Sequence, residues 1–344
     1  MRTPYQPQRV LLTGAAGVVG RFLLPELASL GAPLRLLAHR SPVPGLLRRA
    51  DLEMRAGDLG RPSTLRGVAE GCDVVVHAAA RTGFGSLSRD AQRQVNVEGT
   101  AALLREARSA GARVFVLVGY AGTVQERDDR SEPVDEDTPP EGEYAADYVR
   151  TKYETEAMTL EANGQGGMRT LVVSPGVLLH RDAPTLLSGL IGLFAGGELP
   201  FRLLEDVWLA TSDAADVARC VAAAVERGPG GRRYFAAGEC LRLGELYDRL
   251  SGLTGVPPPR RRLPDLLVEE LGLLSPVLPR GSFLRQMILP RDLAAHLRRL
   301  APLESRRTRE TLGFRPTPLE DTLRSMLGPL VAAPDCGAAG EGLS

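Results

Sequence analysis

A tyrosine and a lysine stand four positions apart, at Tyr148 and Lys152. Residues at i and i+4 share one face of a helix, so a helix here would project the phenol and the ammonium group together. A phenol titrates near pH ~10 in water, and a neighbouring cation stabilises its ionised form. The pair therefore predicts an acid/base tyrosine assisted by a lysine. The alternative interpretation is that the two side chains merely coincide on a surface helix.

A glycine-rich turn lies near the start of the chain, between an apolar run and a stretch of helical periodicity. Glycines allow a tight turn and a close approach of the backbone to a pyrophosphate, whose charge then sits at a helix N-terminus. The turn therefore predicts a dinucleotide site, although a purely structural turn could use the same glycines. The predicted contacts are Thr13, Gly14, Ala16, Gly17, Val18, Val19 and Gly20.

The choice of dinucleotide depends on the end of the second predicted strand. An acid there would accept from the ribose 2′-hydroxyl and favour NAD. The residues at 38–41 include no acid, and Arg40 would instead neutralise the 2′-phosphate of NADP, or would simply be solvated. NADP is therefore the expected cofactor, with NAD as the alternative. Asp58 and Leu59 are placed to meet the adenine, although Asp58 would equally cap a helix beginning at Pro62.

The elements that must position these residues alternate between short apolar runs and helical spacing, which is typical of a parallel sheet covered on both faces. The predicted fold class is α/β, a doubly wound parallel Rossmann sheet with a smaller, mixed C-terminal substrate lobe. Acids and prolines at Gln125–Tyr144 predict an exposed loop. Strands are expected at Arg9–Thr13, Leu34–His39, Asp73–Ala78, Val114–Val118 and Arg169–Ser174, and helices at Val18–Leu30, Pro62–Glu70 and Ser88–Ala110.

The chain is expected to divide into a dinucleotide-binding domain at 1–178, to which about 205–237 returns, and a substrate lobe at 179–330. Residues 331–344 are expected to form a disordered tail. The leucine-rich stretch from Leu263 would form a packed lobe, with a lipophilic substrate pocket or a membrane-surface contact as alternatives.

The amino-acid composition excludes several classes of binding partner and site. The 344 residues carry 42 Lys plus Arg and 42 Asp plus Glu, and this balance argues against a nucleic-acid partner. No run approaches the ~20 apolar residues of a membrane span, and the polar start is unlike a secretory signal. The four cysteines lie far apart without a CxxC pair, so we expect no metal site, no disulfide framework and a cytoplasmic location.

Taken in order, the motifs resemble the extended short-chain dehydrogenase/reductase superfamily, also called the NAD-dependent epimerase/dehydratase family. Its dihydroflavonol reductase-like and hopanoid-associated members are the nearest in pattern. The resemblance runs from Arg9 to about Leu327. Besides the glycine turn and Tyr148 with Lys152, it rests on Val76–Ala80, Val95–Thr100, Ser174–Gly176, Asp213–Ala218 and Leu312–Pro316.

The resemblance implies roles for individual residues. Lys152 would hold the nicotinamide ribose and lower the pKa of Tyr148, and Asn96 would fix a helix bend or a water near the site. The sequence departs from the pattern where a catalytic serine usually polarises the substrate carbonyl. Tyr120 stands there, so either its phenol or the hydroxyl of Thr123 would take over. The remaining implied cofactor contacts are Ala78, Ala79, Ala80 and Pro175.

The expected function is that of an NADP-preferring oxidoreductase that reduces a ketone or aldehyde, or oxidises the alcohol, with Tyr148 as the acid/base. One alternative is a nucleotide-sugar epimerase or dehydratase with tightly held NAD. Another is a non-catalytic dinucleotide-sensing protein, which the tyrosine at position 120 would favour. The expected partner is a small-molecule substrate, and relatives suggest a homodimer formed through the helices that contain Asn96 and Tyr148.

Overall fold

The computed structural model describes residues 4–39, 52–85, 89–182, 185–274 and 288–328. Its main element is a seven-stranded sheet in which every neighbouring pair is parallel. Runs of Val and Leu form these strands because the central ones are buried on both faces. In spatial order the strands are β3 (Leu52–Ala56), β2 (Leu34–Ala38), β1 (Val10–Thr13), β4 (Val74–His77), β5 (Val114–Val118), β6 (Arg169–Ser174) and β9 (Arg232–Phe235).

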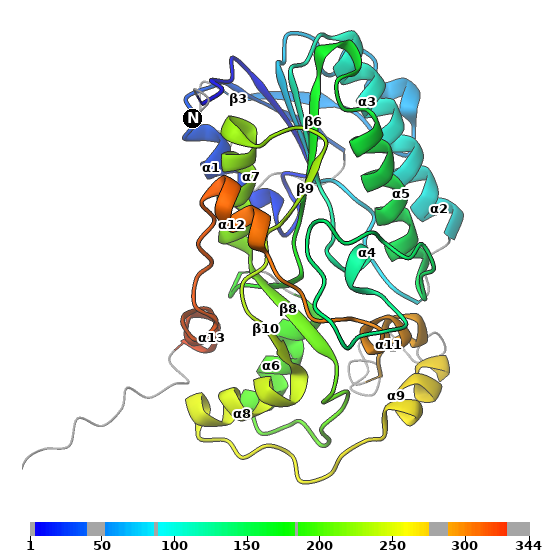
Figure 1. The fold of residues 1–344 in the computed structure, drawn as a ribbon, viewed down its shortest axis with the longest axis vertical. Coiled ribbons are helices and arrows are strands. Elements are labelled where there is room, and N and C mark those ends of the chain that lie inside the picture. Colours follow the sequence, from blue (N-terminus) through cyan, green and yellow to red (C-terminus); the bar gives the residue numbers. More distant parts are fainter. Residues whose placement is uncertain (1–3, 40–51, 86–88, 183–184, 275–287, 329–344) are drawn as a thin grey trace, which may run out of the picture.

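Helices cover both faces of this sheet (Figure 1). On one face, α1 (Gly20–Ala28) packs against α7 (Ala214–Arg227). On the other face lie α3 (Gly99–Ser109) and α5 (Asp147–Glu161). Each pair of helices closes its own apolar core against alternate residues of the strands. The strand order reverses direction between β1 and β4, which is where ligands bind in doubly wound sheets.

The second lobe is smaller and mixed, and it lies beneath the sheet in Figure 1. Its three-stranded sheet pairs β8 (Trp208–Asp213) in parallel with β7 (Val177–Leu179) and antiparallel with β10 (Cys240–Arg242). Leucines dominate its core. These observations confirm the predicted fold class. The lobe's helices include α6 (Leu186–Ala195), α8 (Leu243–Thr254), α9 (Asp265–Leu271), η4 (Gly272–Leu274), α11 (Arg291–Arg298) and α13 (Leu319–Leu327).

The predicted strands agree with the structure within one residue at each end, but the helix predicted at Pro62–Glu70 was wrong and the one predicted at Ser88–Ala110 is not a single α-helix. The segment expected to be helical over Pro62–Glu70 forms only a short 3-10 helix, η1 (Pro62–Leu65), because Gly67 turns the chain at φ +69°. The stretch expected as one helix over Ser88–Ala110 is interrupted after α2 (Arg89–Arg93) by a π-helical segment, η2 (Gln94–Glu98). The tail predicted at 331–344 lies outside the described residues.

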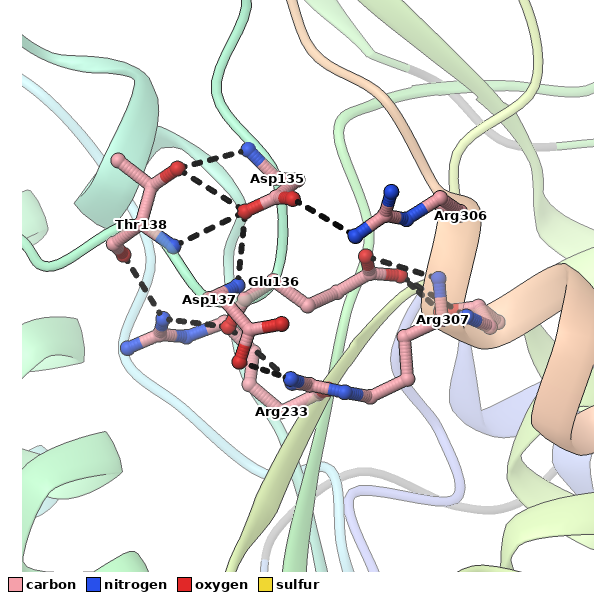
Figure 2. Close-up of polar contacts among 8 residues, drawn as sticks. Asp135, Glu136, Asp137, Thr138, Arg233, Arg306 and Arg307 are labelled. Carbon is pink, nitrogen blue, oxygen red and sulfur yellow. Dashed lines mark hydrogen bonds and ion pairs between the residues drawn. The ribbon is translucent and has the colours of Figure 1, made fainter.

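The segment that leads from β5 to α5 is largely an exposed loop, as predicted, but several of its residues are buried and held in place. Glu136 is 4% exposed, and its carboxylate accepts hydrogen bonds from the backbone of Arg307 and from the backbone and hydroxyl of Thr308. Arg233, on β9, donates to the carbonyl oxygens of Glu136 and Thr138, and Figure 2 shows these arginines on either side of the loop. The loop therefore joins β9 to the start of α12 (Arg306–Leu312) and fixes the chain before α5.

Three cysteines, Cys72, Cys220 and Cys240, are free thiols among the described residues. Within the same ranges no group of His, Cys, Asp or Glu side chains is arranged to hold a metal ion. A search of the described helices finds none with the length and apolar character that crossing a bilayer requires.

Candidate active site

A cavity of about 1290 Å³ lies at the carboxyl ends of the central strands and extends into the small lobe. The structure brings most of the predicted site residues together around it. Three of them, Thr13, Asn96 and Thr123, do not line it, and Arg40 lies outside the described residues. The predicted residues on the cavity wall are Gly14, Ala16, Gly17, Val18, Val19, Gly20, Asp58, Leu59, Ala78, Ala79, Ala80, Tyr120, Tyr148, Lys152 and Pro175.

The glycine turn forms one end of the cavity. Gly14 has φ +75°, and a Cβ atom built there would lie 2.6 Å from the backbone nitrogen of Ala79. A Cβ at Gly20 would lie 1.9 Å from the carbonyl oxygen of Gly14. Glycine is therefore required at both positions, and it leaves the backbone open toward the cavity at the start of α1. This arrangement fits the pyrophosphate of a dinucleotide.

Thr13 supports the turn from behind. Its side chain is fully buried, and its hydroxyl lies 2.6 Å from Nδ1 of His77 and accepts a 3.2 Å hydrogen bond from the backbone of Ala79. The hydroxyl thus fixes the segment that follows β4. Thr13 was predicted to contact the cofactor. It does not line the cavity, because the turn lies between its side chain and the cavity.

The outer end of the cavity contains His39, Asp58 and Leu59. One carboxylate oxygen of Asp58 lies 3.1 Å from Nε2 of His39, and the other accepts a 2.8 Å hydrogen bond from the backbone of Gly60. Asp58 therefore faces the cavity and also holds its own turn. The short helix at Pro62 is capped by Arg61 without a side-chain hydrogen bond, so Asp58 does not cap it, and its contact with the adenine stays a prediction.

Tyr148 and Lys152 project into the middle of the cavity from the first turns of α5. The ammonium of Lys152 donates a 2.7 Å hydrogen bond to the carbonyl oxygen of Val118, and burial lowers its pKa to about 8. Burial raises the pKa of Tyr148 to about 12. The direction is opposite to the expected lowering of the tyrosine pKa, because burial disfavours the charged phenolate. At neutral pH Tyr148 is thus a phenol with a proton to donate.

Thr123 does not reach the cavity, so it cannot replace the usual serine. It is fully buried, and its hydroxyl lies 3.1 Å from a carboxylate oxygen of Glu156. Glu156 is one helical turn beyond Lys152 and forms a buried ion pair with Arg233. Burial raises the pKa of the Glu156 carboxyl, and the nearby Arg233 charge opposes that shift. The short helix α4 (Gly122–Gln125) directs Thr123 into this buried group and away from the site.

Tyr120 does face the cavity, at the end of β5. Its ring centroid lies 5.9 Å from that of Tyr148. Two further aromatic residues, neither of them identified from the sequence, lie beside these tyrosines: Phe84 on the cavity wall and His296 buried behind Tyr120. Phe84 lies 5.4 Å from the Tyr148 ring in an edge-to-face arrangement, and His296 places Nε2 2.9 Å from the Tyr120 hydroxyl. Phe84 comes shortly after the predicted cofactor contacts Ala78–Ala80, and this position in the sequence could have identified it as a site residue. No local signal marks His296.

Asn96 acts at a distance from the cavity. It is buried within the π-helical segment η2, where its side-chain oxygen accepts a 2.7 Å hydrogen bond from the backbone of Arg81. Its amide donates to the hydroxyl of Thr151, on α5. Asn96 therefore ties the chain after β4 to the helix that bears Tyr148. Asn96 lies within this π-helical segment, a feature that is frequent at functional sites.

The half of the cavity within the small lobe is apolar. Aliphatic side chains reach it from β7, α6, β8 and α11, and Phe84 adds an aromatic ring beside Tyr148. The leucines on this wall are Leu178, Leu186, Leu187, Leu190, Leu193, Leu203, Leu204, Leu209, Leu243, Leu289, Leu293 and Leu297. The site thus joins a polar end suited to a dinucleotide to a hydrocarbon-lined end, with Tyr148 between them.

Comparisons with known proteins agree with this geometry. A model of the NAD dependent epimerase/dehydratase family matches residues 10–237. Sterol demethylase protein B of Methylococcus capsulatus is 32% identical over 89% of this chain and 93% of its own length. The 4-hydroxy-2-methyl-3-oxo-4-farnesyl-3,4-dihydroquinoline-1-oxide ketoreductase of Stigmatella aurantiaca is 32% identical over 66% of this chain and 67% of its own. The crystal structure of gox2253 superposes with a TM-score of 0.77 at 28% identity, covering 93% of this chain and 97% of that one.

The family match spans the sheet, the glycine turn, Tyr148 and Lys152, and one relative matches nearly the whole chain. Family and enzyme class, predicted from the motifs, are thereby confirmed. The chain belongs to the NAD-dependent epimerase/dehydratase family, the extended branch of the short-chain dehydrogenases/reductases.

Proposed function

We propose that the protein is a reductase that transfers hydride from a nicotinamide dinucleotide to the carbonyl carbon of a lipophilic ketone, or catalyses the reverse oxidation. The observation that carries this proposal is the hydrocarbon wall next to Tyr148. A buried apolar wall binds a substrate through the hydrophobic effect, at roughly 25 cal/mol for each Å² of apolar surface removed from water. The relative named for a farnesyl-bearing ketone supports the same substrate class.

The chemistry divides between cofactor and chain. The glycine turn and Lys152 would hold the dinucleotide, which would supply the hydride when bound. Tyr148 donates its proton to the carbonyl oxygen as the alcohol forms. With a pKa of about 12, the phenol is protonated throughout the neutral range, as reduction requires. Lys152, held by the carbonyl of Val118, places a positive charge one turn below the phenol.

We further propose that NADPH is preferred. The sequence has no acid at 38–41 to accept from a ribose 2′-hydroxyl, and Arg40 supplies a charge for a 2′-phosphate. Fluorescence titrations with NADPH and with NADH, on protein freed of bound nucleotide, test this choice. Tighter binding of NADPH supports it, and tighter binding of NADH discards Arg40 as the partner of the phosphate.

The nucleotide-sugar alternative finds less support in the wall of the cavity. A sugar diphosphate calls for cations, preferably arginines, at the substrate end. Among the described residues the charged groups there are Arg81 and Glu198, one of each sign. Arg262, from the basic triplet of the sequence, instead pairs with Glu205 and Asp206, away from the cavity. The non-catalytic alternative conflicts with Tyr148 and Lys152 facing one cavity.

The proposal is tested by measuring the rate of NADPH oxidation with each of four candidate substrates. These are a steroid ketone, decalone, a long-chain methyl ketone and a UDP-sugar. We expect turnover with at least one lipophilic ketone and none with the UDP-sugar. Tyr148→Phe should lower kcat by at least about 10²-fold, because the proton donor is lost, and should leave NADPH affinity within about twofold. Equal turnover by this variant would contradict the assigned role of Tyr148. Tyr144→Phe, at a buried tyrosine outside the cavity wall, is the matched control.

A further inference from the structure

Three hydrogen-bonded side chains, Tyr120, His296 and Glu126, lead from the cavity into the protein interior. The Tyr120 hydroxyl lies 2.9 Å from Nε2 of His296, and Nδ1 of the same imidazole lies 2.6 Å from a carboxylate oxygen of Glu126. His296 and Glu126 are both 0% exposed. A buried imidazole with a carboxylate at one nitrogen and a phenol at the other is a costly arrangement unless each contact is satisfied. The arrangement therefore calls for a functional explanation.

The backbone holds these residues in place although 170 positions separate Glu126 from His296. Glu126 forms an antiparallel bridge with Leu300, next to the end of α11. The backbone of Arg127 donates a 2.9 Å hydrogen bond to the carbonyl of Arg299, and that of Ala301 donates one of 2.8 Å to the carbonyl of Gln125. This pairing fixes α11 against the segment that follows Tyr120. The contact between the imidazole and the phenol thus rests on a rigid frame.

Hydrogen-bond donors determine where the protons lie. The second carboxylate oxygen of Glu126 accepts from the backbone of Ala145, at 2.6 Å, and from Arg299, at 3.1 Å. A carboxylate that accepts at both oxygens leaves Nδ1 of His296 as the donor. Nε2 then either accepts from Tyr120, if the imidazole is neutral, or donates to the phenol oxygen, if it is an imidazolium. Only the second arrangement leaves the phenol hydrogen free to point into the cavity.

The contacts of His296 fit a ring that donates a hydrogen bond at both nitrogens. Glu126 lies against Nδ1, and Arg299 contacts Glu126 by an ion pair that leaves the inner carboxylate oxygen to the imidazole. Tyr120 faces Nε2, and burial raises the pKa of its phenol well above the usual value, so it remains a neutral donor. Phe84 packs on the ring of His296 and also contacts Tyr148. The buried carboxylate is thus the charge that compensates the imidazolium.

We propose that Tyr120 is the second catalytic hydrogen-bond donor to the substrate oxygen, and that His296 and Glu126 are positioning residues that keep its O–H directed into the cavity. The inference rests on the proposed reduction. Tyr120 takes the place of the serine expected at this position, and a donor of this kind contributes about 10²–10³ in rate. Tyr148 gives up its proton to the oxygen, while Tyr120 stabilises the developing negative charge and keeps its own proton.

A double-mutant cycle tests the proposal on the ketone that the wild-type protein reduces fastest. Tyr120→Phe should lower kcat about 10²-fold with KM within about twofold. His296→Asn should have a similar effect, because the shorter amide can meet Glu126 at the position of Nδ1 but leaves Tyr120 without its partner. In the Tyr120→Phe background, His296→Asn should cost less than about twofold more, because its effect acts through the phenol. Multiplicative losses in the double variant would assign His296 a separate structural role and overturn the proposal.

A second measurement is independent of turnover. The chain has 4 histidines, so nitrogen-15 NMR of histidine-labelled protein should resolve His296 through the His296→Asn variant. We expect both of its ring nitrogens to carry protons at neutral pH, and Glu126→Gln to remove the proton from Nε2. An unprotonated Nε2 in the wild-type protein would refute the proposed hydrogen bond from His296 to the Tyr120 oxygen. Glu161→Gln, at an exposed glutamate at the end of α5, is the matched control.

The two kinds of failure are distinguishable. A wild-type protein that reduces no ketone of the panel contradicts the proposed function, and the NMR result then decides alone whether His296 is arranged as proposed. Full ketone turnover by Tyr120→Phe would leave the reductase function standing and would overturn the role of Tyr120. Thermal unfolding of each variant excludes loss of folding as the cause of a low kcat.

Discussion

His77 shows how a single side chain can support the site without charge. It lies at the end of β4, 1% exposed, with Thr13 at one ring nitrogen and the hydroxyl of Thr100 2.9 Å from the other. Burial, together with the smaller effect of the Lys152 charge, lowers the pKa of His77 to about 3. The neutral imidazole thus bridges the glycine turn and α3. His77 is thus fully buried behind the wall of the cavity.

The pKa of His77 predicts a pH-dependent stability. The unfolded chain binds a proton near pH ~6.5 and the folded protein does not, so the free energy of unfolding should fall as the pH decreases below that value. The slope approaches about 1.4 kcal/mol per pH unit for one group. Urea unfolding between about pH 7 and about pH 5, above the range where most carboxylates titrate, measures it.

In the same experiment, His77→Gln should be less stable at neutral pH but should lose this slope. His180→Gln is the control, because the side chain of His180 is 19% exposed, unlike that of His77. An unchanged slope in His77→Gln would show that other groups cause the pH dependence.

At the scale of elements, the unit formed by β1, the turn and α1 depends on close backbone contacts. Gly20→Ala would place a Cβ 1.9 Å from the carbonyl oxygen of Gly14, and backbone cannot yield as a flexible side chain would. We expect NADPH affinity to fall at least about 10-fold, since the turn must open and its amides move away from the pyrophosphate. Gly252→Ala is the control, because Gly252 lies within α8 with nothing near its Cβ position. That variant should bind normally and gain up to about 1 kcal/mol in stability. Normal NADPH binding by Gly20→Ala would show that the turn does not hold the cofactor.

The sequence predicted those features that depend on residues close to one another along the chain. The glycine turn, the parallel strands and the helix of Tyr148 were predicted because their residues are consecutive or one turn apart. Side-chain direction was harder to predict, as Thr123 shows: one short helical turn directs it to Glu156 rather than into the cavity. His296 could not be predicted at all. It lies 176 positions from Tyr120 in the sequence, and the two are brought together by a backbone pairing between segments that show no strand pattern.

At the scale of the whole molecule, the end of the described chain joins the two lobes. Leu312 and Phe314, which lie in sequence between α11 and α13 of the small lobe, pack into the core between the sheet and the helices α1 and α7. Asp216, at the start of α7, accepts hydrogen bonds of 2.6 and 2.9 Å from the backbone and hydroxyl of Thr317. Figure 1 shows α12 beside α7, with α13 below it toward the small lobe. The apolar half of the cavity is thereby held at a fixed distance from the dinucleotide half.

This fixed arrangement predicts how reactivity depends on the length of the substrate. Each methylene buried against the leucine wall contributes about 0.8 kcal/mol, so kcat/KM should rise up to about fourfold per added carbon in a series of methyl ketones until the apolar half is filled. Leu190→Gln, on the wall contributed by α6, should flatten the rise while NADPH affinity stays within about twofold. Leu266→Gln is the matched control, because this leucine of α9 is 69% exposed and does not line the cavity. A series with no dependence on chain length in the wild-type protein would mean that the hydrocarbon wall does not receive the substrate, and would return the choice of substrate to polar ligands.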